Sequence, residues 1–102
     1  MSYMMTSISL KFHLVSESGL RVGHLNVHHL LNKVPDISSF LNNKHFCIHL
    51  LGLSETLLDY RMSDESIAIP QYLTLRHDAI KPGETGLAIY IIYSLFYPKY
   101  HH

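Results

Sequence analysis

The sequence contains little cysteine, no surplus charge of either sign and no long apolar run, and each of these absences counts against certain classes of protein. Cys47 is the single cysteine among 102 residues, so no disulfide can form within the chain. A lone cysteine inside an apolar stretch usually packs as a small hydrophobic side chain. It also favours a reducing, intracellular setting.

The balance of charge is even. Eight lysines and arginines offset eight aspartates and glutamates, which gives a net charge of zero with neutral histidines. Binding to phosphate backbones draws on a surplus of Lys and Arg. The composition therefore counts against a strong electrostatic grip on nucleic acid by this stretch of chain alone.

Apolar runs are too short for a membrane span. The run Leu87 to Tyr97 has about half of the roughly 20 residues that a spanning helix needs. The segment Met1 to Ser9 has no basic charge ahead of an apolar stretch, as a secretory signal would. We therefore expect no membrane partner and no secretory leader.

The remaining composition is that of one globular domain, with 47% hydrophobic and 16% charged residues. Residues 1–18 stay unassigned, and we expect one domain over residues 19–97 followed by a tail of residues 98–102. Within the domain, periodicity predicts a helix and four strands, the third of them interrupted by Pro70 as at a sheet edge or bulge. The predicted strands are Leu20 to Val27, His45 to Leu53, Ser66 to Arg76 and Gly86 to Ile92.

The helix is predicted from the spacing of Leu30, Val34, Ile37 and Leu41, which fall on one helical face. Pro35 suits the first turn of a helix, where its missing N–H is not needed. Asparagines 42 and 43 are a plausible stop, and a polar loop from Thr56 to Ser66 follows the next strand. Lys81-Pro82-Gly83-Glu84 predicts a turn that joins the last two strands as a hairpin.

The most informative stretch is the apolar run Leu50 to Leu53, which ends in Ser54-Glu55-Thr56. An apolar run of this kind suits a strand buried on both faces of an α/β core. Ligand-binding groups in such folds collect beyond the carboxyl ends of the strands. Glu55 stands at that place, and a carboxylate there suits a hard cation such as Mg²⁺. The alternative is a glutamate that is solvated and idle at the exit of a strand.

Several histidines and one aspartate are candidates for metal binding or catalysis, but the sequence favours structural roles for them. His24 and His28 lie four apart, which invites a zinc site, although His24 falls in a predicted strand. His49 is interpreted as a core histidine bonded to backbone or water. His77 and Asp78 are neighbours on a strand, so they point to opposite faces rather than form a dyad, and we expect Asp78 to bond its own backbone in a turn.

Two further sets of side chains are open to interpretation. Ser54 and Thr56 are candidate nucleophiles without a placed base, and support of Glu55 is the favoured role. Four aromatic side chains near the end of the sequence offer a platform for stacking nucleic-acid bases, with core filling as the alternative. These are Tyr93, Phe96, Tyr97 and Tyr100.

The order of five short motifs resembles a known family. The motifs are Leu25-Asn26-Val27, Asn32-Lys33, Leu51-Gly52-Leu53-Ser54-Glu55-Thr56, Ile69-Pro70-Gln71-Tyr72 with Arg76-His77-Asp78, and Gly86-Leu87-Ala88-Ile89-Tyr90. Together they are similar to the amino-terminal part of the endonuclease/exonuclease/phosphatase superfamily. The nearest branch is the apurinic-type endonuclease domain of non-LTR retrotransposons, which precedes the reverse transcriptase.

The resemblance implies a fold, a reaction and two site residues. The fold is α/β (α+β), the amino-terminal half of a two-sheet sandwich with its active site at one rim. The reaction is Mg²⁺- or Mn²⁺-dependent cleavage of a DNA phosphodiester, in an intracellular setting with the nucleus as one candidate. Asn26 and Glu55 match the catalytic positions that hold the metal and its phosphate environment.

The same comparison implies that important groups are missing. The family's tyrosine, its Asp-x-Asn pair and its late Asp-His pair have no counterpart in these 102 residues, and the link after the first strand carries His28-His29 in place of Arg-Ser. We therefore expect a truncated endonuclease domain that is inactive alone. The alternatives are a non-catalytic module that associates through an exposed sheet face, a decayed relic, and a superfamily member acting on an inositol phosphate or a lipid phosphodiester.

Overall fold

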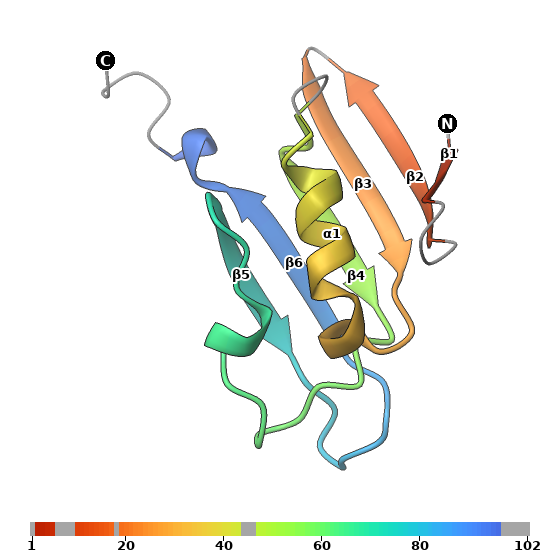
Figure 1. The fold of residues 1–102 in the computed structure, drawn as a ribbon, viewed down its shortest axis with the longest axis vertical. Helices are drawn as coiled ribbons and strands as arrows, with labels where there is room; N and C mark the ends of the chain where they lie inside the picture. The colour runs from red at the N-terminus through yellow and green to blue at the C-terminus, as the bar shows by residue number, and fades with distance from the viewer. Residues whose placement is uncertain (1, 6–9, 18, 44–46, 97–102) are drawn as a thin grey trace.

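The computed structural model describes residues 2–5, 10–17, 19–43 and 47–96, the first two ranges as backbone only. Its strands form one mixed sheet in the order β1-β2-β3-β4-β6-β5 (Figure 1). They are β1 Ser2–Met5, β2 Leu10–Glu17, β3 Leu20–Asn26, β4 Leu50–Ser54, β5 Tyr72–His77 and β6 Leu87–Ile92. β3 and β4 are parallel, and every other pair of neighbours is antiparallel. The chain is thus a small mixed α/β domain.

A helical crossover joins the two parallel strands, as parallel neighbours require. It consists of the 3-10 helix η1 (Leu30–Lys33) followed by α1 (Val34–Leu41). Leu30, Ile37 and Leu41 are buried as the helical spacing predicts, and Val34 packs against them. Pro35 lies in the first turn, and Asn42 caps the end of α1. The predicted helix is therefore confirmed in position and in buried face.

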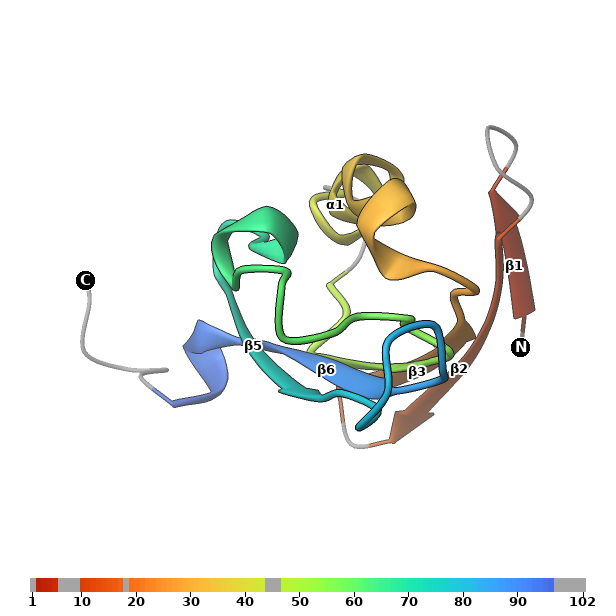
Figure 2. The same cartoon turned by 90° about the horizontal axis from the view of Figure 1, so that it is seen from below.

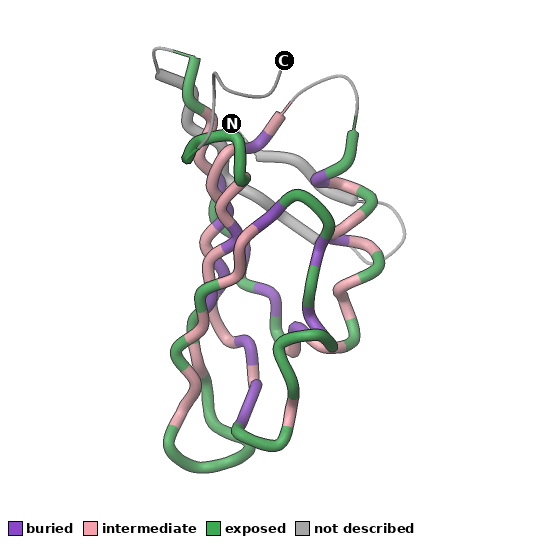
Figure 3. The backbone as a smooth tube through the Cα atoms, turned by 90° about the vertical axis from the view of Figure 1, so that its left-hand side faces the viewer, coloured by how far each residue is buried: buried purple, intermediate pink, exposed green. Residues whose placement is uncertain are grey.

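The core lies between the sheet and α1. Figure 2 shows α1 and the segment after β4 on the same side of the sheet. Along β4, Leu51 and Leu53 are buried in the core, whereas Leu50 and Gly52, which alternate with them, are only half-buried. Figure 3 shows buried and less buried stretches alternating along the chain. The expectation that β4 is buried on both faces is therefore wrong for the described part of the chain. No second sheet is present among the described residues, so the sandwich stays a prediction.

Several predicted boundaries shift in the structure. The second predicted strand is shorter, because β4 begins at Leu50, and the third begins only at Tyr72, after Pro70. β5 is an edge strand and forms the predicted hairpin with β6, across a turn closed by a bond from Glu84 N to Lys81 O of 3.2 Å. The segment left unassigned contributes β1 and β2, while residues 98–102 lie outside the described chain.

The segment between β4 and β5 contains only the short 3-10 helix η2 (Glu65–Ile67), and η3 (Tyr93–Leu95) follows β6. The segment with η2 agrees with the predicted polar loop. Within residues 2–5, 10–17, 19–43 and 47–96, no helix is both long and apolar enough to cross a membrane.

Two tyrosines tie the sheet to the loops above it. The Tyr72 hydroxyl donates to Ile48 O at 2.6 Å, and the Tyr90 hydroxyl donates to Ile67 O. The two rings meet edge to face at 6.5 Å. Burial raises the pKa of Tyr72 to about 12 and raises that of Tyr90 as well. Both phenols therefore remain protonated donors at neutral pH.

Replacing Tyr90 by phenylalanine should lower the free energy of unfolding by about 1–2 kcal/mol, because the Ile67 carbonyl loses its buried donor. Urea unfolding followed by circular dichroism measures the change. Tyr60→Phe is the matched control, since Tyr60 is exposed and should tolerate the loss of its hydroxyl. Equal stability of the Tyr90→Phe protein and the parent would show that this bond adds nothing.

Candidate functional site

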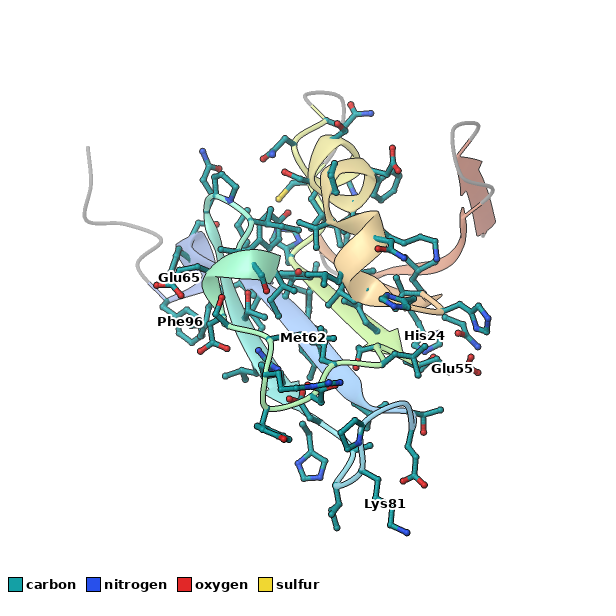
Figure 4. The ribbon with its side chains drawn as sticks, turned by 60° about the horizontal axis from the view of Figure 1, so that its bottom comes forward. His24, Glu55, Met62, Glu65, Lys81 and Phe96 are labelled. Carbon is teal, nitrogen blue, oxygen red and sulfur yellow. The ribbon has the colours of Figure 1, made fainter. Side chains whose placement is uncertain are left out.

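The carboxyl ends of β3 and β4 lie side by side and place the two predicted site residues together. Asn26 is in register with Ser54, the residue before Glu55. Parallel hydrogen bonding continues past the strand ends, from Val27 N to Ser54 O at 3.0 Å and from His29 N to Glu55 O at 2.9 Å. Figure 4 shows Glu55 at the rim of the sheet, just beyond the end of β4. The location expected for a ligand-binding carboxylate is thus the one observed.

The Glu55 carboxylate is held from both sides. Asn26 Nδ2 donates to Oε2 at 2.9 Å, and His28 Nδ1 lies 2.9 Å from Oε1. The Glu55 side chain is 37% exposed and that of His28 is 80% exposed, so the cluster is open to solvent. The hydrogen bond from His28, and then that from Asn26, lower the pKa of Glu55 below its usual range. The group is therefore an ionised acceptor at neutral pH.

Sequence patterns did not predict the part played by His28. The residue was interpreted as a link residue or as half of a zinc pair with His24. Its contact with Glu55 depends on a left-handed backbone at His28, with φ of 51°, and at His29, with φ of 91°. Side chains other than glycine rarely adopt that conformation, so no sequence pattern signals it.

Glu55 itself has a left-handed backbone, with φ of 56°. Such conformations cost on the order of 1 kcal/mol each and persist only where the surroundings enforce them. Here the enforcing contacts are the backbone bonds between the two strand ends and the ammonium of Lys33, which donates to Val27 O at 2.8 Å and to His28 O at 2.7 Å. Strained residues therefore cluster at the site and are braced by the first turn of the crossover.

Lys33→Met should release this brace, because methionine keeps the length of the side chain and loses both donors. We expect the amide signals of His28 and Glu55 to shift in a nitrogen–proton NMR spectrum and the stability to fall by about 1–2 kcal/mol. Lys81→Met, in the exposed turn, serves as the control. Unchanged signals at both positions in Lys33→Met would contradict a bracing role.

The donor set suits a cation that keeps most of its own water. Among the described residues no group of three or more His, Cys, Asp or Glu side chains converges on a common point. A closed zinc site needs four such ligands, so His24 and His28 do not form one there. Mg²⁺, by contrast, is often bound through one or two carboxylates with several waters retained. Glu55 fits that second kind of site, while Asn26 Nδ2 donates to its carboxylate and so supports the ligand.

The expected support of Glu55 by Thr56 is wrong in its detail. Thr56 is fully buried, and its hydroxyl has no hydrogen-bond partner within the described chain. The hydroxyl lies close to Gly86, the residue before β6, and Thr56 N donates to Gly86 O at 3.2 Å. Thr56 therefore anchors the backbone behind Glu55 while its side chain faces inward.

Asp78 bonds a side chain and not its own backbone, which corrects the predicted turn. Its carboxylate accepts from Arg76 Nε at 3.1 Å and from Nη2 at 2.6 Å. Arg76 also donates to Asp59 O at 3.0 Å and to Met62 O at 2.8 Å. Through these bonds the pair holds the segment after β4 against the sheet.

The remaining candidates are His49, Cys47 and the aromatic residues near the end of the sequence. His49 Nδ1 accepts from the backbone N–H of Arg21 at 2.9 Å, which confirms the expected bond, but His49 is half-buried and lies outside the buried core. Cys47 is half-buried. Tyr93 and Phe96 are exposed, whereas Tyr97 and Tyr100 lie outside the described residues.

Comparison with family models, with curated proteins and with solved structures found no match to this chain. The resemblance to the endonuclease/exonuclease/phosphatase superfamily therefore stays a prediction from motifs. What bears on function is the geometry at the ends of β3 and β4, where an ionised carboxylate is oriented by an amide and an imidazole.

Proposed function

We propose that this chain provides the metal-binding part of a phosphodiester-cleaving site, with DNA as the substrate of the complete enzyme. One observation supports the proposal above all others. Glu55, beyond the end of β4, is held by Asn26 from the adjacent parallel strand, so two residues from separate predicted motifs meet at one point. The coincidence is informative because the two residues are 29 positions apart in sequence.

In this proposal Glu55 holds a Mg²⁺ or Mn²⁺ ion and Asn26 orients the carboxylate by donating to Oε2. A bound divalent ion would neutralise charge that develops on a phosphate during cleavage. The strained backbone at Glu55 presents the carboxylate outward at the rim, where a phosphate could approach.

These residues alone should not cleave DNA. Catalytic groups that act together fail together when some are absent, and the 102 residues contain no Asp-x-Asn pair to complete the metal site. We therefore expect metal binding by this chain without cleavage. Nicking of supercoiled plasmid by the purified chain in Mg²⁺, abolished in Glu55→Ala, would contradict the expected inactivity.

Mn²⁺ binding tests the proposed site directly. Free Mn²⁺ measured by electron paramagnetic resonance should show one bound ion, and Glu55→Gln should weaken its affinity by at least about tenfold, since the charged ligand is lost. Glu84→Gln removes the same charge from the exposed β5–β6 turn and is the matched control. No binding at millimolar Mn²⁺, or equal binding by the Glu55→Gln protein, would overturn the proposal.

A DNA experiment tests the substrate class. Fluorescence anisotropy of a labelled short duplex should report weak binding that depends on the divalent ion and on Glu55, because the ion would bridge the carboxylate to a phosphate. DNA binding that is unchanged in EDTA and in Glu55→Gln would show that it does not depend on the metal site, which would count against DNA as the substrate.

A second candidate function is that of an interaction module, and the sheet face opposite α1 favours it. Strand alternation places five aliphatic side chains of β5 and β6 on this face, and Leu75 and Leu87 are 49% and 56% exposed. The five are Leu73, Leu75, Leu87, Ile89 and Ile91. An exposed apolar surface of this kind is typical of a site of association.

Sedimentation equilibrium tests association through this face. The parent should form oligomers as its concentration rises, and Leu87→Glu should remain monomeric because a charge on the apolar face opposes burial. Ile80→Glu places the same charge in the exposed turn and should associate like the parent. A parent that is monomeric at every concentration would remove this candidate.

A further inference from the structure

The proposed function does not use the imidazole of His28. Its ring extends from the turn after β3 and is 80% exposed, yet Nδ1 is directed at Glu55 Oε1. Asn26 occupies the other oxygen, Oε2. One carboxylate oxygen of Glu55 therefore accepts from the Asn26 amide, and the other faces the His28 nitrogen, an atom that can bind a metal ion.

The separation of these two atoms is informative. Two ligands bound at right angles to one metal ion, each at about 2.1 Å, lie about 3.0 Å from each other. His28 Nδ1 and Glu55 Oε1 are 2.9 Å apart. An ion that binds both atoms would lie to one side of the line that joins them, so the imidazole would turn towards the ion and carry its proton on Nε2.

The position of the imidazole is held by the backbone. The left-handed conformation at His28 and the two bonds from Lys33 hold the turn that carries the ring. A preorganised ligand loses less conformational entropy when it binds an ion. This turn thus places a nitrogen ligand beside the carboxylate before any ion arrives.

We infer that His28 Nδ1 and Glu55 Oε1 together chelate one divalent transition-metal ion, so that the site takes Mn²⁺ or Co²⁺ in preference to Mg²⁺. Imidazole nitrogen suits transition metals, whereas Mg²⁺ favours oxygen ligands only. The inference rests on the proposed metal site at Glu55 and adds a ligand and a metal preference to it.

The test compares the metal affinities of His28→Gly with those of the parent, since glycine removes the ring and accepts the left-handed backbone. Direct Mn²⁺ titration and displacement by Mg²⁺ give the two affinities. We expect His28→Gly to weaken Mn²⁺ binding by at least about tenfold and Mg²⁺ binding by less than about threefold. His24→Ala removes another exposed imidazole, from β3, and should change neither affinity.

Pulsed electron paramagnetic resonance provides a readout that does not depend on affinity. Bound Mn²⁺ should show coupling to an imidazole nitrogen in the parent and in His24→Ala, and none in His28→Gly. Mn²⁺ that binds through Glu55 without nitrogen coupling, and equally well in His28→Gly, would overturn this inference and leave the proposed function intact. A parent that binds no Mn²⁺ would overturn both.

Discussion

Gly86→Ala is expected to destabilise the protein by about 2 kcal/mol, whereas Gly52→Ala should leave its stability nearly unchanged. A Cβ at position 86 would lie 2.9 Å from Thr56 Oγ1, 3.1 Å from His77 O and 3.3 Å from Ala79 N. Two of these neighbours are backbone atoms, which cannot rotate away. At position 52 the nearest atoms lie 3.9 Å from the added carbon, an ordinary contact.

The effect of Gly86→Ala should reach the candidate site. Gly86 O accepts the N–H of Thr56, and Thr56 directly follows Glu55. Displacing this contact should shift the Glu55 amide in an NMR spectrum and weaken Mn²⁺ binding, while Gly52→Ala alters neither. Urea unfolding and Mn²⁺ titration of both variants measure these effects. Equal behaviour of the two alanine variants would mean that the backbone around Gly86 adapts and does not position Glu55.

Arg76→Met should lower the free energy of unfolding by about 2–3 kcal/mol. The Arg76 side chain is 15% exposed and donates to two loop carbonyls and to Asp78. Methionine fills a similar volume but leaves the carbonyls of Asp59 and Met62 without this donor. It also leaves the Asp78 carboxylate, which is mostly buried, without its cation.

Loss of these bonds should loosen the segment between β4 and β5. Trypsin cleavage after Arg61, an exposed residue in that segment, should become faster in Arg76→Met than in the parent under native conditions. Lys81→Met removes a cation from the exposed turn and should change neither stability nor cleavage after Arg61. Parent-like stability and cleavage in Arg76→Met would show that other contacts hold the segment in place.

The candidate site could be predicted from the sequence only in part. Glu55 was predicted because it follows an apolar run and Asn26 because it matches a motif of the similar family, and Asn26 Nδ2 lies 2.9 Å from Glu55 Oε2 in the structure. His28 was missed because its contact depends on a left-handed backbone that histidine seldom adopts. The inward orientation of Thr56 was missed as well, since it follows from the approach of Gly86, a residue 30 positions away.

Local patterns in the amino-acid order were sufficient for the elements whose form depends on near neighbours. The helical spacing from Leu30 to Leu41 located α1 and its buried face, and the Pro-Gly turn located the β5–β6 hairpin. These elements are specified by side chains three or four positions apart, or by the backbone preferences of single residues. Such information is present in any short window of the sequence.

The order of the strands was decided only in three dimensions. Nothing in the sequence places β4 between β3 and β6, or pairs β1 and β2 with the same sheet. Strand pairing uses backbone N–H and C=O groups, which almost every residue has, so the pattern of side chains does not name the neighbour. The meeting of Asn26, His28 and Glu55 follows from that pairing, because it depends on two strand ends that are distant in sequence and adjacent in the sheet.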